Sequence, residues 1–408
     1  MFLDKDFYDG IVFSLFVMSS IIEDELASSS VIQHVNRLDF DYVPEELPHR
    51  DNQLRLLAQL FKQTLKGVSQ NAIITGPVGS GKTVMAKKIC KELTKYARKQ
   101  GTVLEYVHVN CRKKSTESMA LLSVLNHFDP GFPDRGFSVQ EMLEVLKRQL
   151  VRRKAHLIIV LDEADALLKK SGSDLIYDLS RFSDESSQNK VSISLLLISQ
   201  QNVLNLLDAA ALSTFKRSNV IKLDKYARDE LFDIVKQRVN LSFLPGTVQQ
   251  DSIELIADIA AEWGDARFAI ELLSKAGIAA DHEHTDRVVP EFVRAAKAET
   301  YSVVTETKLQ NLNRHQLLTL DAIANRLQRD GTAYLNTGDA EKMYAFICEQ
   351  HEEKPRGHTM FWQYLKDIEN AGFITVKKSG KGQLGTTQLI SLPDIPAEIM
   401  HQKVNEIL

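Results

Sequence analysis

A glycine-rich loop at residues 76–83 has the composition needed to hold phosphate groups. Its sequence, Gly76-Pro-Val-Gly-Ser-Gly-Lys-Thr83, fits the pattern GxxxxGK[ST], follows an apolar run and opens a helical pattern at 84–99. Glycines let successive backbone N–H groups surround phosphate oxygens, and the helix start adds further donors. Lys82 would neutralise charge on the β- and γ-phosphates, and Thr83 would ligate Mg²⁺. The expected phosphate contacts are Gly76, Gly79, Ser80, Gly81, Lys82 and Thr83. The alternative, an ordinary glycine-rich turn, is disfavoured by the strand in front of it.

Two carboxylates stand at the end of an apolar run that is typical of a buried strand. The run at 156–161 is followed directly by Asp162 and Glu163, 80 residues after Lys82. Carboxylates at the end of a central strand are costly to bury unless they meet a cation or water. Asp162 would hold the Mg²⁺ shell, and Glu163 would polarise the water that attacks the γ-phosphate. The alternative is a capping box in which Asp162 and Asp165 start the next helix; the position behind the phosphate loop disfavours it.

These residues need a scaffold, and the surrounding sequence predicts a parallel sheet. Short, nearly continuous apolar runs alternate with helical patterns, as in strands that are buried on both faces. The expected strands are 71–75, 103–109, 156–161, 193–199 and 220–223. The predicted fold class is therefore α/β, with a phosphate-binding loop on a parallel sheet.

Two further units follow the sheet. After Tyr226, helical patterns at 229–241, 248–262 and 265–282 predict a small helical domain, and 290–300 is a further, connecting helix. From about Thr307 the pattern predicts three helices and a strand pair joined by a glycine-rich loop, which is typical of a winged helix. These elements are expected at 313–328, 340–352, 356–370, 373–378 and 387–392, with the loop at 379–386.

The helix at 356–370 has the two faces that a recognition helix needs. Apolar positions line one face (Phe361, Tyr364, Leu365 and Ile368), and Thr359, Gln363 and Lys366 line the other. Residues 354–388 hold six Lys or Arg and two acids, a local charge of +4 that suits phosphate contact. The expected DNA contacts are Arg356, Thr359, Gln363, Lys366, Lys377, Lys378 and Lys381. The alternative is a protein-docking winged helix with a solvated basic loop.

Composition limits the remaining possibilities. The length of 408 residues favours two or three domains. The 50 basic and 54 acidic residues give a net charge of −4, which excludes a uniformly basic protein that coats nucleic acid. The 44% hydrophobic and 25% charged content excludes collagen, a coiled-coil rod and wholesale disorder. Three separated cysteines, Cys90, Cys111 and Cys348, indicate no disulfide framework and favour a reducing compartment.

The N-terminal segment shows no membrane signal. The apolar stretch at 10–22 is too short to span a bilayer, and acidic residues precede it, which does not suit a secretory signal. We expect a frayed or docked segment at 1–38 and no membrane partner. Met18 is an alternative start, and N-terminal mass spectrometry would distinguish it from Met1.

Together these motifs resemble the archaeal replication initiators of the origin-recognition and cell-division-control family, which are AAA+ ATPases with a C-terminal winged helix. The resemblance rests on the Asp162-Glu-Ala-Asp165 motif, the stretches at 42–50 and 132–138, the sensor-two-like run at 264–277 and the terminal winged helix, and covers about 29–392. It implies that Val43, Pro44 and Arg50 lie near the adenine and that Tyr226 and Arg238 contact nucleotide at the start of the lid. It further implies that Arg267 is sensor two and reaches toward the γ-phosphate, where a planar cation can bridge phosphate oxygens.

Four positions depart from the family pattern. Gln200 stands where sensor one is usually Asn, and Ala210 stands where the family has an arginine finger, for which Lys216 or Arg217 could substitute. Gln383 and Leu384 make the wing less arginine-rich than is usual in the family. Since a finger contributes roughly 10³-fold or more to turnover, we expect slow hydrolysis and long-lived ATP or ADP states.

The sequence therefore predicts an N-terminal segment at 1–38, partly flexible, an AAA+ base at 39–228, a helical lid at 229–300 and a winged helix at 305–408. By the resemblance, ATP or ADP with Mg²⁺ would be the cofactor, with Lys82, Asp162, Glu163, Gln200 and Arg267 catalytic. The partners would be double-stranded origin DNA, a replicative helicase and paralogous initiator subunits, in the cytoplasm at the nucleoid. The alternative function is a nucleotide-gated transcriptional regulator with little catalysis; a metabolic kinase is more distant, because nothing in the sequence indicates an acceptor pocket.

Overall fold

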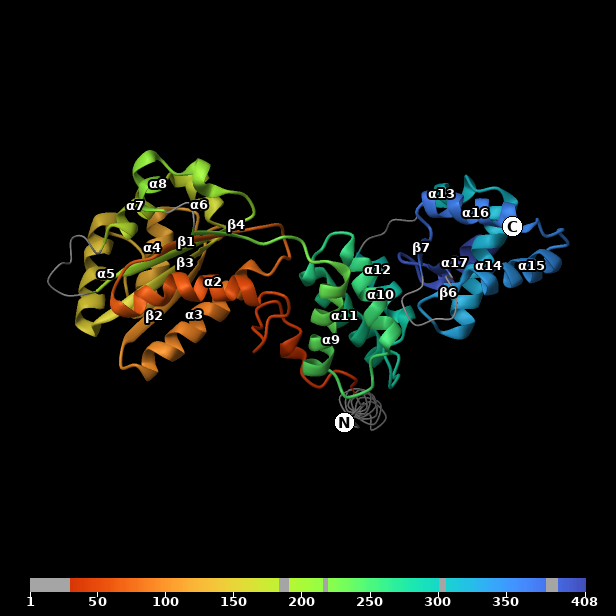
Figure 1. The fold of residues 1–408 in the computed structure, drawn as a ribbon, viewed down its shortest axis with the longest axis horizontal. Coiled ribbons are helices and arrows are strands. Elements are labelled where there is room, and N and C mark those ends of the chain that lie inside the picture. The colour runs from red at the N-terminus through yellow and green to blue at the C-terminus, as the bar shows by residue number, and fades with distance from the viewer. Residues whose placement is uncertain (1–29, 183–190, 216–218, 301–305, 379–387) are drawn as a thin grey trace, which may run out of the picture. The chain divides into compact units, whose positions relative to one another are not determined.

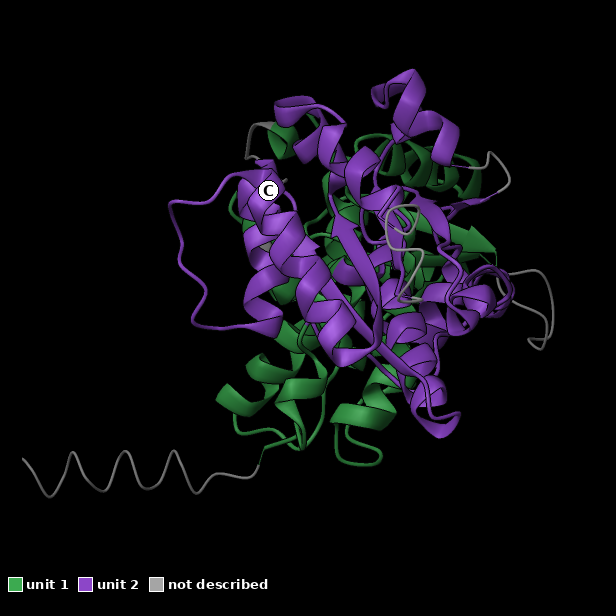
Figure 2. Cartoon of the chain, turned by 90° about the vertical axis from the view of Figure 1, so that its left-hand side faces the viewer, with its two compact units in different colours: residues 1–39, 235–262, 268–408 green, residues 40–234, 263–267 purple. Residues whose placement is uncertain are grey.

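The computed structural model describes residues 30–182, 191–215, 219–300, 306–378 and 388–408. Predictions for 1–29, for Lys216 and Arg217, and for the wing loop with Lys381 lie outside the described residues. Figure 2 shows two compact units. Unit 1 comprises 1–39, 235–262 and 268–408, and unit 2 comprises 40–234 and 263–267.

Unit 2 contains a five-stranded parallel sheet of order β2-β3-β4-β1-β5 (Figure 1). The strands are β1 (Asn71–Thr75), β2 (Val103–Asn110), β3 (Ala155–Asp162), β4 (Ile193–Ser199) and β5 (Val220–Lys222). They match the five predicted strands to within one residue at either end. In register, Asn110 of β2 pairs with Asp162 of β3, so the predicted carboxylates end a strand that has a neighbour on each side.

Helices cover both faces of this sheet, which explains the nearly continuous apolar strands. On one face lie α2 (Asp51–Phe61) and α3 (Lys82–Lys99), which bury Ala72 and Ile74. Ile73 points to the opposite face, in a core shared with other helices. Those helices are α4 (Glu117–Phe128), α5 (Val139–Arg153), α6 (Ala164–Ser171), α7 (Asp174–Ser180) and α8 (Ala209–Thr214). Short 3₁₀ turns are η1 (Val35–Arg37), η2 (Lys62–Lys66) and η3 (Val203–Leu206).

The helices of the predicted lid are distributed over both units. They are α9 (Arg228–Ser242), α10 (Gln250–Ala261), α11 (Ala266–His282) and α12 (Pro290–Thr300), and each lies within about two residues of its predicted range. Helix α11 begins in unit 2 and continues in unit 1. The two compact units therefore divide the predicted lid range of 229–300 between them.

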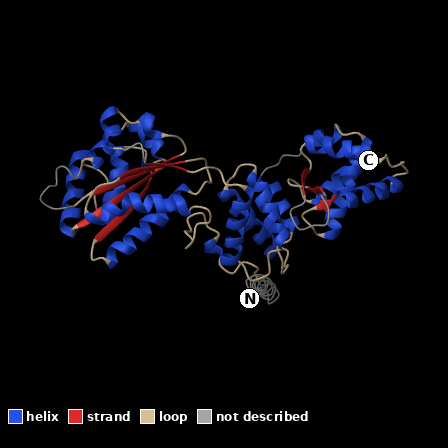
Figure 3. Ribbon diagram, viewed as in Figure 1, coloured by secondary structure: helices blue, strands red, loops and turns tan. Residues whose placement is uncertain are grey.

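The C-terminal part of unit 1 is built around helices and a small antiparallel sheet (Figure 3). Its helices are α13 (Glu306–Gln310), α14 (Arg314–Asp330), α15 (Thr337–Gln350), α16 (His358–Asn370) and α17 (Ala397–Asn405). The sheet has the order β6-β8-β7, with β6 at Leu335–Asn336, β7 at Thr375–Lys378 and β8 at Gln388–Ser391. The predicted strand pair is present as β7 and β8; α13, β6 and α17, which packs against α14, were not predicted.

The three cysteines are buried and free. Burial raises the pKa of the Cys90 thiol to about 12, and burial followed by the charge of Asp162 raises the pKa of Cys111 to about 12. Both thiols are therefore held in their unreactive form. Among the helices that the structure describes, not one combines the length and apolarity needed to cross a membrane.

Candidate nucleotide site and DNA-binding face

The phosphate loop runs from β1 to α3 in a conformation that requires glycine. Gly79 and Gly81 have φ values of 69° and 88°, and a Cβ on Gly76 would lie 2.5 Å from the carbonyl oxygen of Leu223. Lys82 Nζ donates to the carbonyl oxygens of Gly76 at 2.8 Å and Pro77 at 2.5 Å. The side chain of Lys82 is thus folded over the loop with which it was predicted to bind phosphate.

The two predicted metal ligands lie together at the carboxyl end of the sheet. Thr83 Oγ1 donates to Asp162 Oδ2 at 2.7 Å, and the backbone N–H of Glu163 donates to Asp162 Oδ1 at 2.9 Å. Burial alone would raise the pKa of Asp162, but hydrogen bonds from His108 and Thr83 outweigh it and hold the pKa below its ordinary value. A hydroxyl and an ionised carboxylate are oxygen ligands of the kind that Mg²⁺ takes beside nucleotide phosphates, so these residues fit the ion.

Glu163 stands beside this pair in a strained backbone conformation. Its φ of 53° lies in the left-handed region, which is uncommon for a residue with a side chain. Glu163 occupies the N-cap position of α6 without a side-chain cap, so the alternative capping box of Asp162 and Asp165 is wrong. Asp165 instead accepts a hydrogen bond from Ser199 Oγ at 3.0 Å.

Arg50 and Tyr226 form a buried wall next to the phosphate loop. Arg50 Nη2 donates to the carbonyl oxygens of Ser80 at 3.1 Å and Asp224 at 3.3 Å, and its guanidinium lies 3.8 Å from the centre of the Tyr226 ring. A Cβ on Gly81 would lie 2.8 Å from the Tyr226 hydroxyl. In the predicted adenine-side motif, Pro44 is buried and Val43 half-buried.

Arg267 belongs to the same compact unit as the loop. Its side chain is exposed, and its guanidinium lies 5.6 Å from the centre of the Phe40 ring. Burial lowers the pKa of Lys82; Asp162 opposes this shift, and Arg267 adds to it. The charge of Arg267 therefore acts on the loop lysine in the direction opposite to that of Asp162.

Two other predicted residues are placed differently. Gln200 directly follows β4 and is exposed, next to the buried Ser199. Arg238 is buried in unit 1, where its Nη1 donates to the Arg37 carbonyl oxygen at 2.7 Å. Its nucleotide contact stays a prediction.

Sequence reasoning missed three ionisable residues at this site. His108 Nε2 lies 3.1 Å from Asp162 Oδ2, Arg112 Nη1 lies 3.8 Å from Glu163 Oε1, and Asp265 lies against Gly79. The strand period was a usable signal for His108, because it shares a face of β2 with Asn110, at the end of the strand. Nothing local in the sequence indicated the other two.

The predicted recognition helix has the predicted faces. In α16, Phe361, Tyr364, Leu365 and Ile368 are buried, and Thr359, Gln363 and Lys366 are exposed. Arg356, just before the helix, is exposed, and its Nε lies 3.1 Å from Nε2 of His315. Burial and then the charge of Arg356 lower the pKa of His315, so the neutral ring can accept this bond and orient the arginine.

Lys377 of the wing is engaged within unit 1. Its Nζ donates to Asp258 Oδ2 of α10 at 2.6 Å and lies 3.5 Å from the centre of the Tyr334 ring. The Tyr334 hydroxyl donates to the same carboxylate oxygen at 2.5 Å. Lys378, the next residue of β7, is exposed.

Arg294 of α12 connects this helix to the winged helix. Its side chain is 1% exposed, and it donates to the carbonyl oxygens of Leu392, Thr332 and Ala333 at 3.0, 3.0 and 3.1 Å. Glu291 accepts from its Nη1 at 2.9 Å, and the nearby Lys297 pairs with Asp394. We call these contacts, with those of Asp258, the lid–wing joint.

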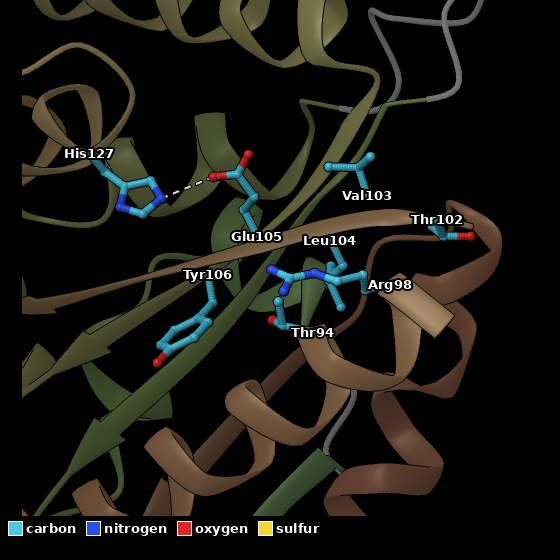
Figure 4. A pocket seen from close by; sticks show the side chains of 8 residues that line it. All are labelled: Thr94, Arg98, Thr102, Val103, Leu104, Glu105, Tyr106 and His127. Carbon is cyan, nitrogen blue, oxygen red and sulfur yellow. Dashed lines mark hydrogen bonds and ion pairs between the residues drawn. The ribbon is translucent and has the colours of Figure 1, made fainter. Parts of the chain in front are cut away.

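A separate pocket of about 330 Å³ lies along the edge strand β2 (Figure 4). Its lining residues are Thr94, Arg98, Thr102, Val103, Leu104, Glu105, Tyr106 and His127, and His127 Nε2 lies 3.0 Å from Glu105 Oε2. It shares no residue with the predicted nucleotide site.

Three family models match the chain in the order of these parts. They are the AAA domain at 65–207, the Cdc6 AAA+ ATPase-type lid domain at 232–298 and the CDC6 C-terminal winged helix domain at 307–402. An ORC1-type DNA replication protein 2 of Sulfurisphaera tokodaii is 31% identical over 407 residues, covering 95% of this chain and 96% of the relative.

Solved structures show the same architecture. Cdc6p of Pyrobaculum aerophilum superposes with a TM-score of 0.78 at 28% identity, covering 93% of this chain and 98% of that one. The Aeropyrum pernix ORC1 protein, solved in complex with DNA, gives a TM-score of 0.61 at 28% identity, with 93% and 97% coverage. The chain therefore belongs to the ORC1- and Cdc6-type family of DNA replication proteins, AAA+ proteins with a helical lid and a C-terminal winged helix.

Proposed function

We propose that this chain is an ATP-binding replication initiator that holds duplex origin DNA in a manner set by its nucleotide. The observation that carries the proposal is the course of α11. Its first residues belong to the unit with the phosphate loop, and its remainder belongs to the unit with the winged helix. A change of bound phosphate at the start of α11 would therefore act on a helix of the DNA-binding unit.

ATP or ADP with Mg²⁺ is the proposed cofactor. Gly76–Thr83 would surround the phosphates, and Thr83 and Asp162 would hold the ion. Bound Mg²⁺ would neutralise charge on the β- and γ-phosphate oxygens. Glu163 would polarise the attacking water, Gln200 would orient it, and Lys82 and Arg267 would balance the charge of the transferred group.

The lid–wing joint supports transmission of the nucleotide state. Arg294 spans the two parts with four hydrogen bonds from a buried guanidinium, a geometry that resists sliding better than apolar contacts do. In the proposed switch, ATP bridges base and lid, and hydrolysis relaxes that closure. The winged helix, fastened to α12, would follow the lid.

Turnover is proposed to be slow. Ala210 of α8 is exposed and carries no charge where the family has an arginine finger, and Gln200 replaces the usual Asn. A missing finger lowers turnover by roughly 10³-fold or more. Long-lived nucleotide states suit a switch better than a motor.

Duplex DNA is the proposed partner of the winged helix. The exposed face of α16, with Thr359, Gln363 and Lys366, offers side chains that can reach base edges and phosphates. The A. pernix relative bound to DNA supports this assignment. A helicase and paralogous initiator subunits are proposed as further partners, and action on DNA would place the protein at the nucleoid.

Neighbouring lysines of β7 provide a matched test of the DNA face. Because side chains alternate along a strand, Lys377 and Lys378 point to opposite faces. We expect Lys378→Ala to reduce the slope of log K against log salt by about 0.9, the value for one phosphate contact. Lys377→Ala should leave the slope unchanged if the lysine stays with Asp258.

Fluorescence anisotropy of a labelled duplex, measured from 50 to 300 mM salt, gives both slopes. Equal losses for the two variants would assign Lys377 to the DNA contact, as the sequence predicts, and would mean that it leaves Asp258. An unchanged slope for Lys378→Ala would remove β7 from the interface.

The second candidate function is a nucleotide-gated transcriptional regulator, which the replacements at Gln200 and Ala210 favour. Chromatin-occupancy mapping of the native protein distinguishes the two. Occupancy at replication origins together with recruitment of the helicase is the result expected of an initiator. Occupancy of promoters without helicase recruitment would identify the regulator.

A further inference from the structure

The residues that open α11 form a turn that lies directly on the phosphate loop. The backbone N–H of Ala266 donates to the Gly79 carbonyl oxygen at 3.2 Å, and the N–H of Tyr226 donates to the Gly264 carbonyl oxygen at 3.2 Å. Gly264 has φ 65°, and a Cβ there would lie 2.6 Å from Cβ of Lys225. The turn is therefore held between the phosphate loop and the segment that follows β5.

Within this turn, the carboxylate of Asp265 faces the phosphate loop. A Cβ built on Gly79 would overlap the carboxylate oxygens of Asp265, so the absence of a side chain on Gly79 makes room for this acid. Asp265 Oδ1 also accepts the backbone N–H of Arg267 at 2.8 Å, which caps the first turn of α11. A negative group thus stands at the mouth of a loop built to bind anions.

Asp265 and Arg267 act on the loop with opposite signs. Asp265 supports the charged form of Lys82, whereas Arg267 opposes it. The turn therefore presents an acid and a base, two residues apart, to the same phosphate-binding lysine. A phosphate that enters the loop would be repelled by the charge of Asp265 and attracted by that of Arg267.

We propose that Asp265 is a specificity residue that sets the preference between ATP and ADP, which rests on the proposed nucleotide binding. Its carboxylate opposes phosphate charge at Gly79, and the opposition grows with the additional charge of the γ-phosphate. The same charge draws Arg267 inward. The number of phosphates on the nucleotide would thus set the free energy of binding beside Asp265. It would also set how strongly Arg267, at the start of α11, is attracted toward the loop.

The test uses variants that remove the negative charge of Asp265 but keep its hydrogen bond at the N-terminus of α11. Asp265→Asn and Asp265→Ser both retain an oxygen that can accept the Arg267 N–H. With Mg²⁺ present, we expect the affinity for ATP to rise about tenfold and that for ADP about threefold, because the removed repulsion scales with ligand charge. Titration of the full chain with fluorescent ATP and ADP analogues at low salt measures both constants.

Asp174→Asn is the matched control, since this exposed acid also lies in the first turn of a helix of unit 2, and α7 packs against β4 and α8. It should change neither affinity. If both Asp265 variants bind ATP and ADP in the wild-type ratio, the inference is overturned. If the wild-type chain binds neither nucleotide, the proposed function itself fails, so the two failures are distinguishable.

Discussion

Replacing Glu163 with glutamine is expected to slow ATP hydrolysis by about 10²–10⁴-fold and to leave ATP affinity within about twofold of wild type. Glutamine keeps the size of the side chain and can still hydrogen-bond water, but it cannot draw off a proton. The groups proposed to hold phosphate and Mg²⁺ are on other residues: Lys82, folded over the loop, and Asp162, paired with Thr83. Binding and chemistry are therefore separable at this position.

Single-turnover release of phosphate from labelled ATP measures the chemical step directly, even when turnover is slow. Lys82→Ala is the companion variant, and it should lose nucleotide binding along with hydrolysis. Hydrolysis by Glu163→Gln within tenfold of wild type would transfer the water-activating role to another residue. Since the Glu163 variant would stay in its ATP form, it also allows origin binding to be measured in a single nucleotide state.

The residues of the nucleotide site were predictable where chemistry and spacing are local in the sequence. Gly76–Thr83 is one continuous motif whose glycines are required by backbone conformation. Asp162 and Glu163 stand at the end of an apolar strand. Because that strand is buried, two carboxylates at its end indicate a functional site. The faces of α16 were likewise predictable. With 3.6 residues per turn, Phe361 and Leu365 lie on one face of the helix, and Gln363 and Lys366 lie on the other.

What escaped prediction depends on pairing between distant segments. Asp265 meets Gly79 only because the chain returns to the loop after leaving the sheet, and no local pattern encodes that return. Strand β6 has only two residues, too few to show alternation. Arg294 lies on an amphipathic helix, where an arginine ordinarily indicates the solvent face, yet here it is buried. Its carbonyl partners are backbone groups, which every residue has, so the sequence does not indicate them.

Arg294→Met is expected to destabilise the C-terminal part of the chain by about 3–5 kcal/mol. Methionine fills much of the space but donates no hydrogen bond. The carbonyl oxygens of Leu392, Thr332 and Ala333 would then lose a donor, at about 1–3 kcal/mol for each that stays dry. Glu291 is about one-third exposed and can regain water, so the cost falls mainly on the carbonyls.

Two further variants serve as controls. Arg294→Lys tests whether the positive charge alone is enough, and Arg329→Met tests the effect of the same substitution at an exposed position. A lysine keeps the charge, but its single nitrogen cannot reach carbonyls on two sides, so an intermediate loss is expected. Arg329 is exposed on α14, and its replacement should change stability by less than about 0.5 kcal/mol. Urea denaturation of the full chain, with hydrogen exchange followed at β6 and β8, measures the loss and locates it.

The same variants test whether the lid–wing joint carries the nucleotide signal. If it does, Arg294→Met should retain ATP binding and a measurable affinity for duplex DNA, yet that affinity should no longer differ between the ATP and ADP forms. The reason is that a winged helix released from α12 cannot follow the lid. DNA affinity that remains nucleotide-dependent in a variant destabilised as predicted would mean that the signal reaches the winged helix by another route.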